Sequence, residues 1–220
     1  MPSSEILGAM SSRRQGFIHS LGTGVTTNVN VGRAICSVIN YSDPNYDKKL
    51  DSIKKGVKIL SDKDYTFPRE ITFHCSSMQE GFSKAPTEAF ARDQNSGLSV
   101  GVFLGVNAIY SPEAIKMGLK EGIAHKVNQY GLEDYTTAVV VHELGHVLHD
   151  MLSTDFFWGD GDKPLSGDDM MIAHSQISPY AATNKKEVVA EVFAAHHLGL
   201  KFSGSQVYDL YQKCKGPVLI

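Results

Sequence analysis

The chain is poor in cysteine. Its 220 residues include only Cys36, Cys75 and Cys214, which are far apart and form no CxxC pair. An odd number of widely spaced cysteines argues against a disulfide framework and against a zinc site built from thiolates. We therefore expect three buried or free thiols.

The sequence also lacks an excess of charge of one sign and lacks long apolar runs. Its formal net charge is −3, with 42% hydrophobic and 20% charged residues, which is ordinary for a globular protein. Because no broad basic field is present, nucleic acid is not an expected partner. No apolar run approaches the length of a membrane span, so we predict no transmembrane segment.

A secretory signal is not visible at the start of the chain. The segment MPSSEILGAMSSRRQGFIHS lacks the apolar core of about 7–15 residues that such a signal needs. We expect that the protein is not exported by that route, or that this chain is a mature or trimmed form. The length favours one domain, or one domain with a small appendage, and we predict an N-terminal arm over residues 1–44, packed on a main domain over 45–220.

Hydrophobic periodicity predicts a mixture of helices and strands. Spacings of three and four predict helices, and alternation predicts strands in REITFHCSS and in GLSVGVFLGV. The 27 residues from 153 to 179, rich in Gly, Asp, Pro and Ser, are expected to form a long loop, and such loops are often functional. The predicted helices cover residues 3–10, 45–61, 111–131, 133–152, 184–199 and 205–213.

The segment VVVHELGHVLHD, residues 139–150, carries the clearest chemical signal. At about 100° per residue, His146 and His149 fall within roughly 40° of His142, and apolar residues fill the opposite face. His142 and His146, one turn apart, can both ligate one Zn²⁺. Glu143 points about 100° away, where it can reach a metal-bound water as a base.

A catalytic zinc needs a third protein ligand, and several side chains are candidates. His149 lies on the same rigid helix, and the metzincin pattern would require Gly at 149 and His at 152, so we expect His149 to lie beside the ligands or in the cleft. Glu187 and Glu191 are again one turn apart on a predicted helix, next to small alanines. Glu187 could complete the ligand set, or it could serve in a capping box with Asn184. The acidic candidates in the predicted loop, for which a solvated turn is preferred, are Asp155, Asp160 and Asp162.

The segment ISPYAATNKKEVVAEVFAAH, residues 177–196, resembles the third-ligand segment of the anthrax lethal factor family of zinc peptidases. These enzymes are gluzincin-like and are related to bacterial Pro-Pro endopeptidases. The family pattern is a tyrosine, a short spacer ending in Asn, and then Glu-x-x-x-Glu, and HELGH matches the first family motif. Lys185-Lys186 and Val188-Val189 depart from the pattern, which bears on substrate preference.

The resemblance implies a role for each matched residue. His142, His146 and Glu187 would be ligands of one zinc ion per chain, and Glu143 would be the base. Tyr180 would stabilise the oxyanion, and Glu191 would support a ligand histidine. The implied fold class is α+β: a single zincin-like metallopeptidase domain, with a small mixed sheet, an active-site helix carrying HELGH and a second helix carrying the glutamate ligand.

The implied function is that of a zinc-dependent endopeptidase acting on a restricted set of proteins, as a bacterial toxin or effector that is secreted or delivered into a target cell. Two alternatives stay open: an inactive zinc-binding interaction module, and a zinc hydrolase of a non-peptide bond. A substrate peptide could add as a strand to a sheet edge near residues 97–107. Phe156 or Trp158 could be a specificity element, or could anchor the 153–179 loop to the core. The sequence does not indicate an oligomeric state.

Overall fold

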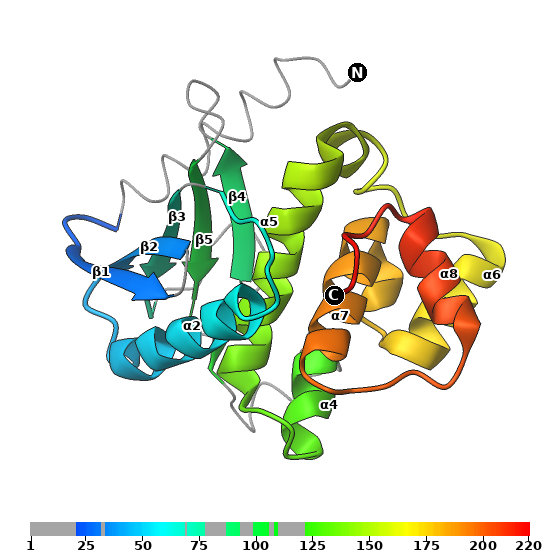
Figure 1. Cartoon of the computed structure of the whole chain (residues 1–220), viewed down its shortest axis with the longest axis horizontal. Coiled ribbons are helices and arrows are strands. Elements are labelled where there is room, and N and C mark those ends of the chain that lie inside the picture. The colour runs from blue at the N-terminus through cyan, green and yellow to red at the C-terminus, as the bar shows by residue number, and fades with distance from the viewer. Residues whose placement is uncertain are drawn as a thin grey trace. The chain divides into compact units, whose positions relative to one another are not determined.

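The structure, a computed structural model, describes residues 21–31, 34–68, 70–77, 87–92, 99–105, 108–109 and 122–220. The chain forms two compact units, residues 1–109 and 110–220. Within the described residues, the first unit holds a sheet and one helix, and the second holds only helices (Figure 1). The fold is therefore a mixed α+β fold, as the periodicity predicted.

The first unit is built on a five-stranded mixed sheet with the order β1-β2-β3-β5-β4. Strands β2, β3 and β5 are parallel, β1 pairs antiparallel with β2, and β4 pairs antiparallel with β5. Helix α2 (Tyr46–Ser61) connects β2 to β3 and buries Ile53, Val57 and Leu60, which confirms the predicted helix over 45–61. The strands are β1 (Val25–Val31), β2 (Ala34–Asn40), β3 (Glu70–Cys75), β4 (Thr87–Arg92) and β5 (Ser99–Leu104).

The predicted edge strand is not an edge. β5 lies between β3 and β4, so Phe103 pairs with His74 on one side and with Glu88 on the other. The prediction that a substrate could add at residues 97–107 is therefore wrong. The predicted alternation correctly places Val102 and Leu104 in the core, but Phe103, on the opposite face of the strand, is buried as well. A strand buried on both faces can carry glycine on one of them, and the sequence alone does not separate this case from a solvated face.

A buried lysine joins the ends of two parallel strands. Lys49 on α2 donates hydrogen bonds to the carbonyl oxygens of Ser76 and Leu104, each at 2.9 Å, and forms an ion pair with Asp43. The Lys49 side chain is fully buried, and these three acceptors compensate its charge. This contact fixes α2 at the carboxyl ends of β3 and β5.

The predicted division of the chain at residue 44 differs from the observed one at residue 109. β1 and β2 come from the expected arm, yet they belong to the same sheet as β3 and β5. The predicted helix over 3–10 lies outside the described residues. Of the predicted helix over 111–131, the structure describes α4 (Ile123–Gln129), which buries Ile123 and Val127, and residues 111–121 lie outside the described part.

The second unit is helical, and its two longest helices are α5 (Tyr135–Gly159) and α7 (Lys185–His197). α5 begins close to the predicted position, and α7 and α8 (Ser205–Lys213) confirm the predicted helices. In the described parts of the chain, no helix combines the length and the apolar character needed to cross a membrane. The shorter elements are α6 (Gly167–Ile172), the π-helical turn η2 (Ala173–Ile177) and the 3-10 turn η3 (Ala181–Thr183).

The prediction of a loop over 153–179 is wrong. α5 kinks at Ser153, where φ is −141° and ψ is 45°, and then continues to Gly159. α6 and η2 fill most of the remainder and leave residues 160–166 as a short connection. The polar and glycine residues that suggested a loop lie at the ends of these short helices, where such residues cap and terminate helices.

Close packing of α5 against α7 brings the two motif helices together (Figure 1). A Cβ atom on Gly145 of α5 would lie 3.0 Å from Phe193 Cδ1 and 3.4 Å from Ala190 Cα of α7. Only a glycine fits at this distance without moving its neighbours. The small residues at 145 and 190 therefore set how near the histidines of α5 come to the glutamates of α7.

Candidate metal centre

Three donor atoms from α5 and α7 form a nearly equilateral triangle. His142 Nε2 lies 3.2 Å from His146 Nε2 and 3.1 Å from Glu187 Oε2, and His146 Nε2 lies 3.3 Å from the same carboxylate oxygen. Tetrahedral Zn²⁺ with bonds of about 2.0–2.1 Å separates its ligand atoms by roughly 3.3–3.4 Å. The triangle therefore has the size that such an ion requires, and it is a group of His and acidic side chains able to hold a metal.

Each motif helix starts at a capping residue that places its ligands. Asp134 accepts hydrogen bonds from the Thr137 backbone N–H at 2.9 Å and from the Thr137 hydroxyl at 2.8 Å at the start of α5. Asn184 accepts the Glu187 N–H at 3.1 Å at the start of α7. The Glu187 backbone thus takes part in the cap, while its carboxylate lies against the two histidines. Only the Asn184 half of a capping box is therefore seen, and the Glu187 carboxylate takes the position considered for a ligand.

Glu191 supports His142 from behind. Glu191 Oε1 lies 2.9 Å from His142 Nδ1, and Oε2 accepts the Ile123 N–H at 2.7 Å and the Ser178 hydroxyl at 2.5 Å. An ionised carboxylate can only accept, so His142 Nδ1 carries a proton that it donates to Glu191 Oε1, and Nε2 is the nitrogen that faces the triangle. A histidine that binds a metal through Nε2 has its Nδ1 proton held in this way. Nothing in the periodicity had indicated Ser178 or Ile123.

The site concentrates negative charge around the histidines. Burial raises the pKa of Glu187, but the charges and hydrogen bonds of His146 and His142 outweigh this effect and hold that pKa well below its usual range. Burial lowers the pKa of His142, but Glu187 and Glu191 raise it further than burial lowers it. A positive charge is therefore favoured between these groups, and a bound cation would supply it.

Glu143 and Tyr180 lie beside the triangle. Glu143 is nearly fully buried on α5, next to His142. The Tyr180 ring centroid is 5.8 Å from that of His142, and its hydroxyl hydrogen-bonds with Glu187. Burial and the nearby glutamates raise the pKa of Tyr180 well above 10, so its hydroxyl remains a proton donor at neutral pH. The structure thus places the Tyr180 ring beside His142.

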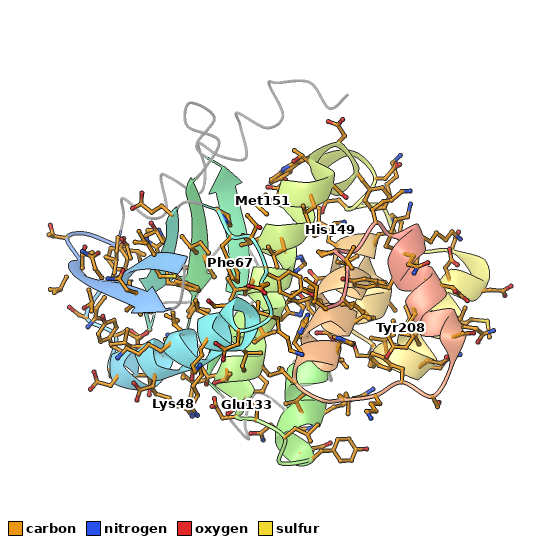
Figure 2. The ribbon with its side chains drawn as sticks, in the orientation of Figure 1. Lys48, Phe67, Glu133, His149, Met151 and Tyr208 are labelled. Atoms are coloured by element: carbon orange, nitrogen blue, oxygen red, sulfur yellow. The ribbon has the colours of Figure 1, made fainter. Side chains whose placement is uncertain are left out.

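His149 does not line a cleft. It is fully buried, and its ring packs edge-on against Phe157 at 5.2 Å between centroids and near Phe156 at 5.9 Å. Burial lowers the pKa of His149, the charges of His146 and Lys186 lower it further, and the resulting pKa is about 3. A hydrogen bond to the Cys214 backbone raises this pKa but does not offset the lowering. Figure 2 shows His149 projecting from α5 among the side chains of the second unit. It is a neutral core residue, and the helical wheel had indicated only its direction.

The three aspartates considered as ligands lie elsewhere. Asp155 is exposed, Asp160 pairs with Lys163 at 2.5 Å, and Asp162 pairs with Lys186 at 2.8 Å. The solvated positions expected for them are confirmed.

The aromatic residues after the kink anchor this segment. Trp158 donates its indole N–H to Asp150 at 2.9 Å. The Lys186 ammonium lies 4.7 Å from the Trp158 ring centroid and 4.1 Å from that of Phe157. Anchoring to the core, one of the two predicted roles for Trp158, agrees with these contacts.

The sequence was compared with protein-family models and with curated proteins, and neither comparison found a match. The similarity to the lethal factor family therefore rests on two short segments, HELGH at 142–146 and the Tyr180–Glu191 segment.

Proposed function

We propose that this chain is a zinc-dependent endopeptidase that holds one zinc ion with His142, His146 and Glu187. The observation that carries the proposal is the triangle of donor atoms, with sides of 3.1, 3.2 and 3.3 Å. On this proposal the helices of the second unit carry the centre of a zincin-like metallopeptidase.

The chemistry of the donor set favours zinc. Ca²⁺ and Mg²⁺ prefer ligand sets made wholly of oxygen, whereas two imidazoles and a carboxylate suit Zn²⁺. Structural zinc sites use four protein ligands, and catalytic sites use three, which leaves a position for water. Three donors therefore favour a catalytic centre.

The residues around the triangle supply the groups that peptide hydrolysis needs. A zinc ion bound there lowers the pKa of its water towards about 7 and polarises the substrate carbonyl. Glu143, buried beside His142, accepts the proton of the attacking water and delivers it to the leaving amine. Tyr180 keeps its proton and donates a hydrogen bond to the oxygen on which negative charge develops.

The proposed biological setting comes from the resemblance. Lethal factor-like peptidases cleave a few chosen proteins, and we propose the same restricted action here, for a bacterial toxin or effector that is secreted or delivered into a target cell. The substrate is a protein or peptide.

The first experiment measures metal content and peptide cleavage on the purified full chain. We expect about one zinc per chain after supplementation. Wild type should cleave members of a broad peptide library, and Glu143→Gln should bind zinc equally well but lose cleavage. Glu70→Gln, an exposed glutamate on β3, is the matched control and should keep full activity.

Each alternative gives a different result. Zinc binding without cleavage by wild type would overturn the peptidase proposal, and turnover of esters or amides by that protein would then indicate a non-peptide hydrolase. Zinc binding with no turnover at all would indicate an interaction module. A zinc content well below one per chain after supplementation would overturn the metal centre itself.

A further inference from the structure

We propose that Ser178 is a positioning residue for the metal centre. Through Glu191 it holds His142 with Nε2 facing the triangle, and through the Ala181 N–H it fixes the turn that carries Tyr180. The inference rests on the proposed metal centre, but its tests use readouts that do not need peptide cleavage.

The Ser178 hydroxyl is fully buried and makes two hydrogen bonds, one as a donor and one as an acceptor. It donates to Glu191 Oε2 at 2.5 Å and accepts the Ala181 N–H at 3.0 Å. The Ser178 backbone N–H donates to Ala173 O at 3.0 Å, so the residue itself is held at the end of η2. One side chain therefore links Glu191, in the middle of α7, to the turn that precedes this helix.

The bond to Glu191 determines where that carboxylate points. Oε2 is held from two sides, by Ser178 and by the Ile123 N–H, which directs Oε1 to His142 Nδ1. The carboxylate is also enclosed by the chain: a Cβ atom on Gly122 would lie 3.3 Å from one oxygen and 3.4 Å from the other. Loss of the Ser178 hydroxyl removes one of the two contacts that prevent the carboxylate from turning away from His142.

The bond to Ala181 closes the turn around Tyr180. Tyr180 lies between Ser178 and Ala181, the two residues that this bond joins, as in other turns closed by a serine hydroxyl. On the far side, Thr183 donates both its N–H, at 3.1 Å, and its hydroxyl, at 2.8 Å, to the Tyr180 carbonyl oxygen. The backbone of Tyr180 is therefore held on both sides, and Ser178 couples this turn to the histidine ligand.

The test compares Ser178→Ala with Ser178→Thr, which keeps the hydroxyl, and with Ser175→Ala. Ser175 is exposed and donates to Met171 O at 2.6 Å, so it is a matched control three residues away. Zinc affinity is measured by competition with a chelating dye. We expect Ser178→Ala to bind zinc about 10–100-fold more weakly, the range typical for loss of a group that supports a ligand. Ser178→Thr should recover most of the affinity, and Ser175→Ala should match wild type.

A second readout needs neither zinc nor peptide cleavage. Amide exchange at Ala181 should be faster in Ser178→Ala than in wild type, because the variant loses the hydroxyl that accepts the Ala181 N–H. If Ser178→Ala does not fold, Ser178→Cys replaces the hydroxyl by a weaker donor of similar size and takes its place.

Unchanged zinc affinity and unchanged amide exchange at Ala181 in a folded Ser178→Ala variant would overturn the inference. If wild type binds zinc but cleaves no peptide, the peptidase proposal fails while the role of Ser178 is still decided by zinc affinity and amide exchange. If wild type binds no zinc, the inference falls with the metal centre.

Discussion

The ring of Phe157 lies edge-on against the ring of His146, with centroids 6.1 Å apart and planes at 76°. This contact is informative because the two histidines proposed as zinc ligands are held differently. His142 Nδ1 is bonded to Glu191, whereas His146 Nδ1 is buried without a hydrogen-bond partner among the residues that the structure describes. A hydrogen bond therefore orients the His142 ring, whereas aromatic packing against Phe157 orients the His146 ring.

Substitution of Phe157 should affect both stability and metal binding. Phe157→Ala removes the ring contacts to His146 and His149 and the stacking of Lys186, and we expect the free energy of unfolding to fall by about 3–5 kcal/mol. Phe157→Leu should retain most of the stability yet weaken zinc binding, because the leucine no longer presents a flat edge to His146. Urea unfolding and dye competition measure the two effects. Equal zinc affinity in Phe157→Leu and wild type would show that the ring does not orient His146.

Gly145 sets the distance between the motif helices. Gly145→Ala places a Cβ atom 3.0 Å from Phe193 and forces α5 away from α7, so we expect a loss of about 1–3 kcal/mol and weaker zinc binding. Gly159→Ala in the same helix is the matched control, because a Cβ atom there meets nothing within 4 Å. It should be neutral or slightly stabilising through helix propensity. The explanation fails if both variants bind zinc as tightly as wild type.

Lys49 should be essential to the stability of the first unit. Lys49→Met leaves Asp43 buried without its cation, and we expect a loss of about 3–5 kcal/mol in urea unfolding. Lys48→Met changes an exposed lysine of the same helix, labelled in Figure 2, and should change stability little. The double variant Lys49→Met/Asp43→Asn should lose less than the single variant. A double variant that is less stable than Lys49→Met would contradict the view that the uncompensated charge is the main cost.

The stability of the protein should fall as the pH decreases from about 6.5 to 4. Burial lowers the pKa of His74 to about 4, whereas an unfolded histidine titrates near 6.5, so in this interval the unfolded chain binds more protons. If only the unfolded state takes up this proton, the free energy of unfolding falls by about 3 kcal/mol over the interval. The free energy of unfolding of His74→Gln should fall less between pH 7 and pH 4 than that of wild type. The contribution of His149 to this fall should remain. His174→Gln changes an exposed histidine and should match wild type; equal losses in all three proteins would show that His74 is not the source.

Local patterns predicted much of the fold and most of the candidate site. The apolar stripe predicted α2, because an amphipathic helix must bury one face. The spacing of His142, His146, Glu187 and Glu191 placed all four on helix faces that meet in the structure. The pairing of those faces depends on Gly145 and Phe193, whose contact no helical period reveals.

The failures have a common physical cause. Residues 97–107 were assigned to an edge because a face rich in glycine and serine leaves room for a substrate to lie close, and the 153–179 segment was assigned to a loop because of its breakers. In both cases packing partners decided the outcome: the preceding strand β4 pairs with β5, and Lys186 packs on the segment after the kink. The cleft position considered for His149 failed because its direction on α5 was known but the aromatic rings that enclose it were not.

The kink at Ser153 has a consequence for how a metal would be bound. It turns the chain so that the Lys186 N–H donates to Gly161 O at 3.2 Å, which ties the residue just before Glu187 to the segment that follows the HELGH helix. This tie divides the long connection between the ligands into two shorter loops. Bringing Glu187 to the histidines costs conformational entropy, and the chain loses this entropy when it folds. The binding of an ion does not cause that loss. An ion would therefore meet a preorganised chelate, and its binding energy would be available for affinity.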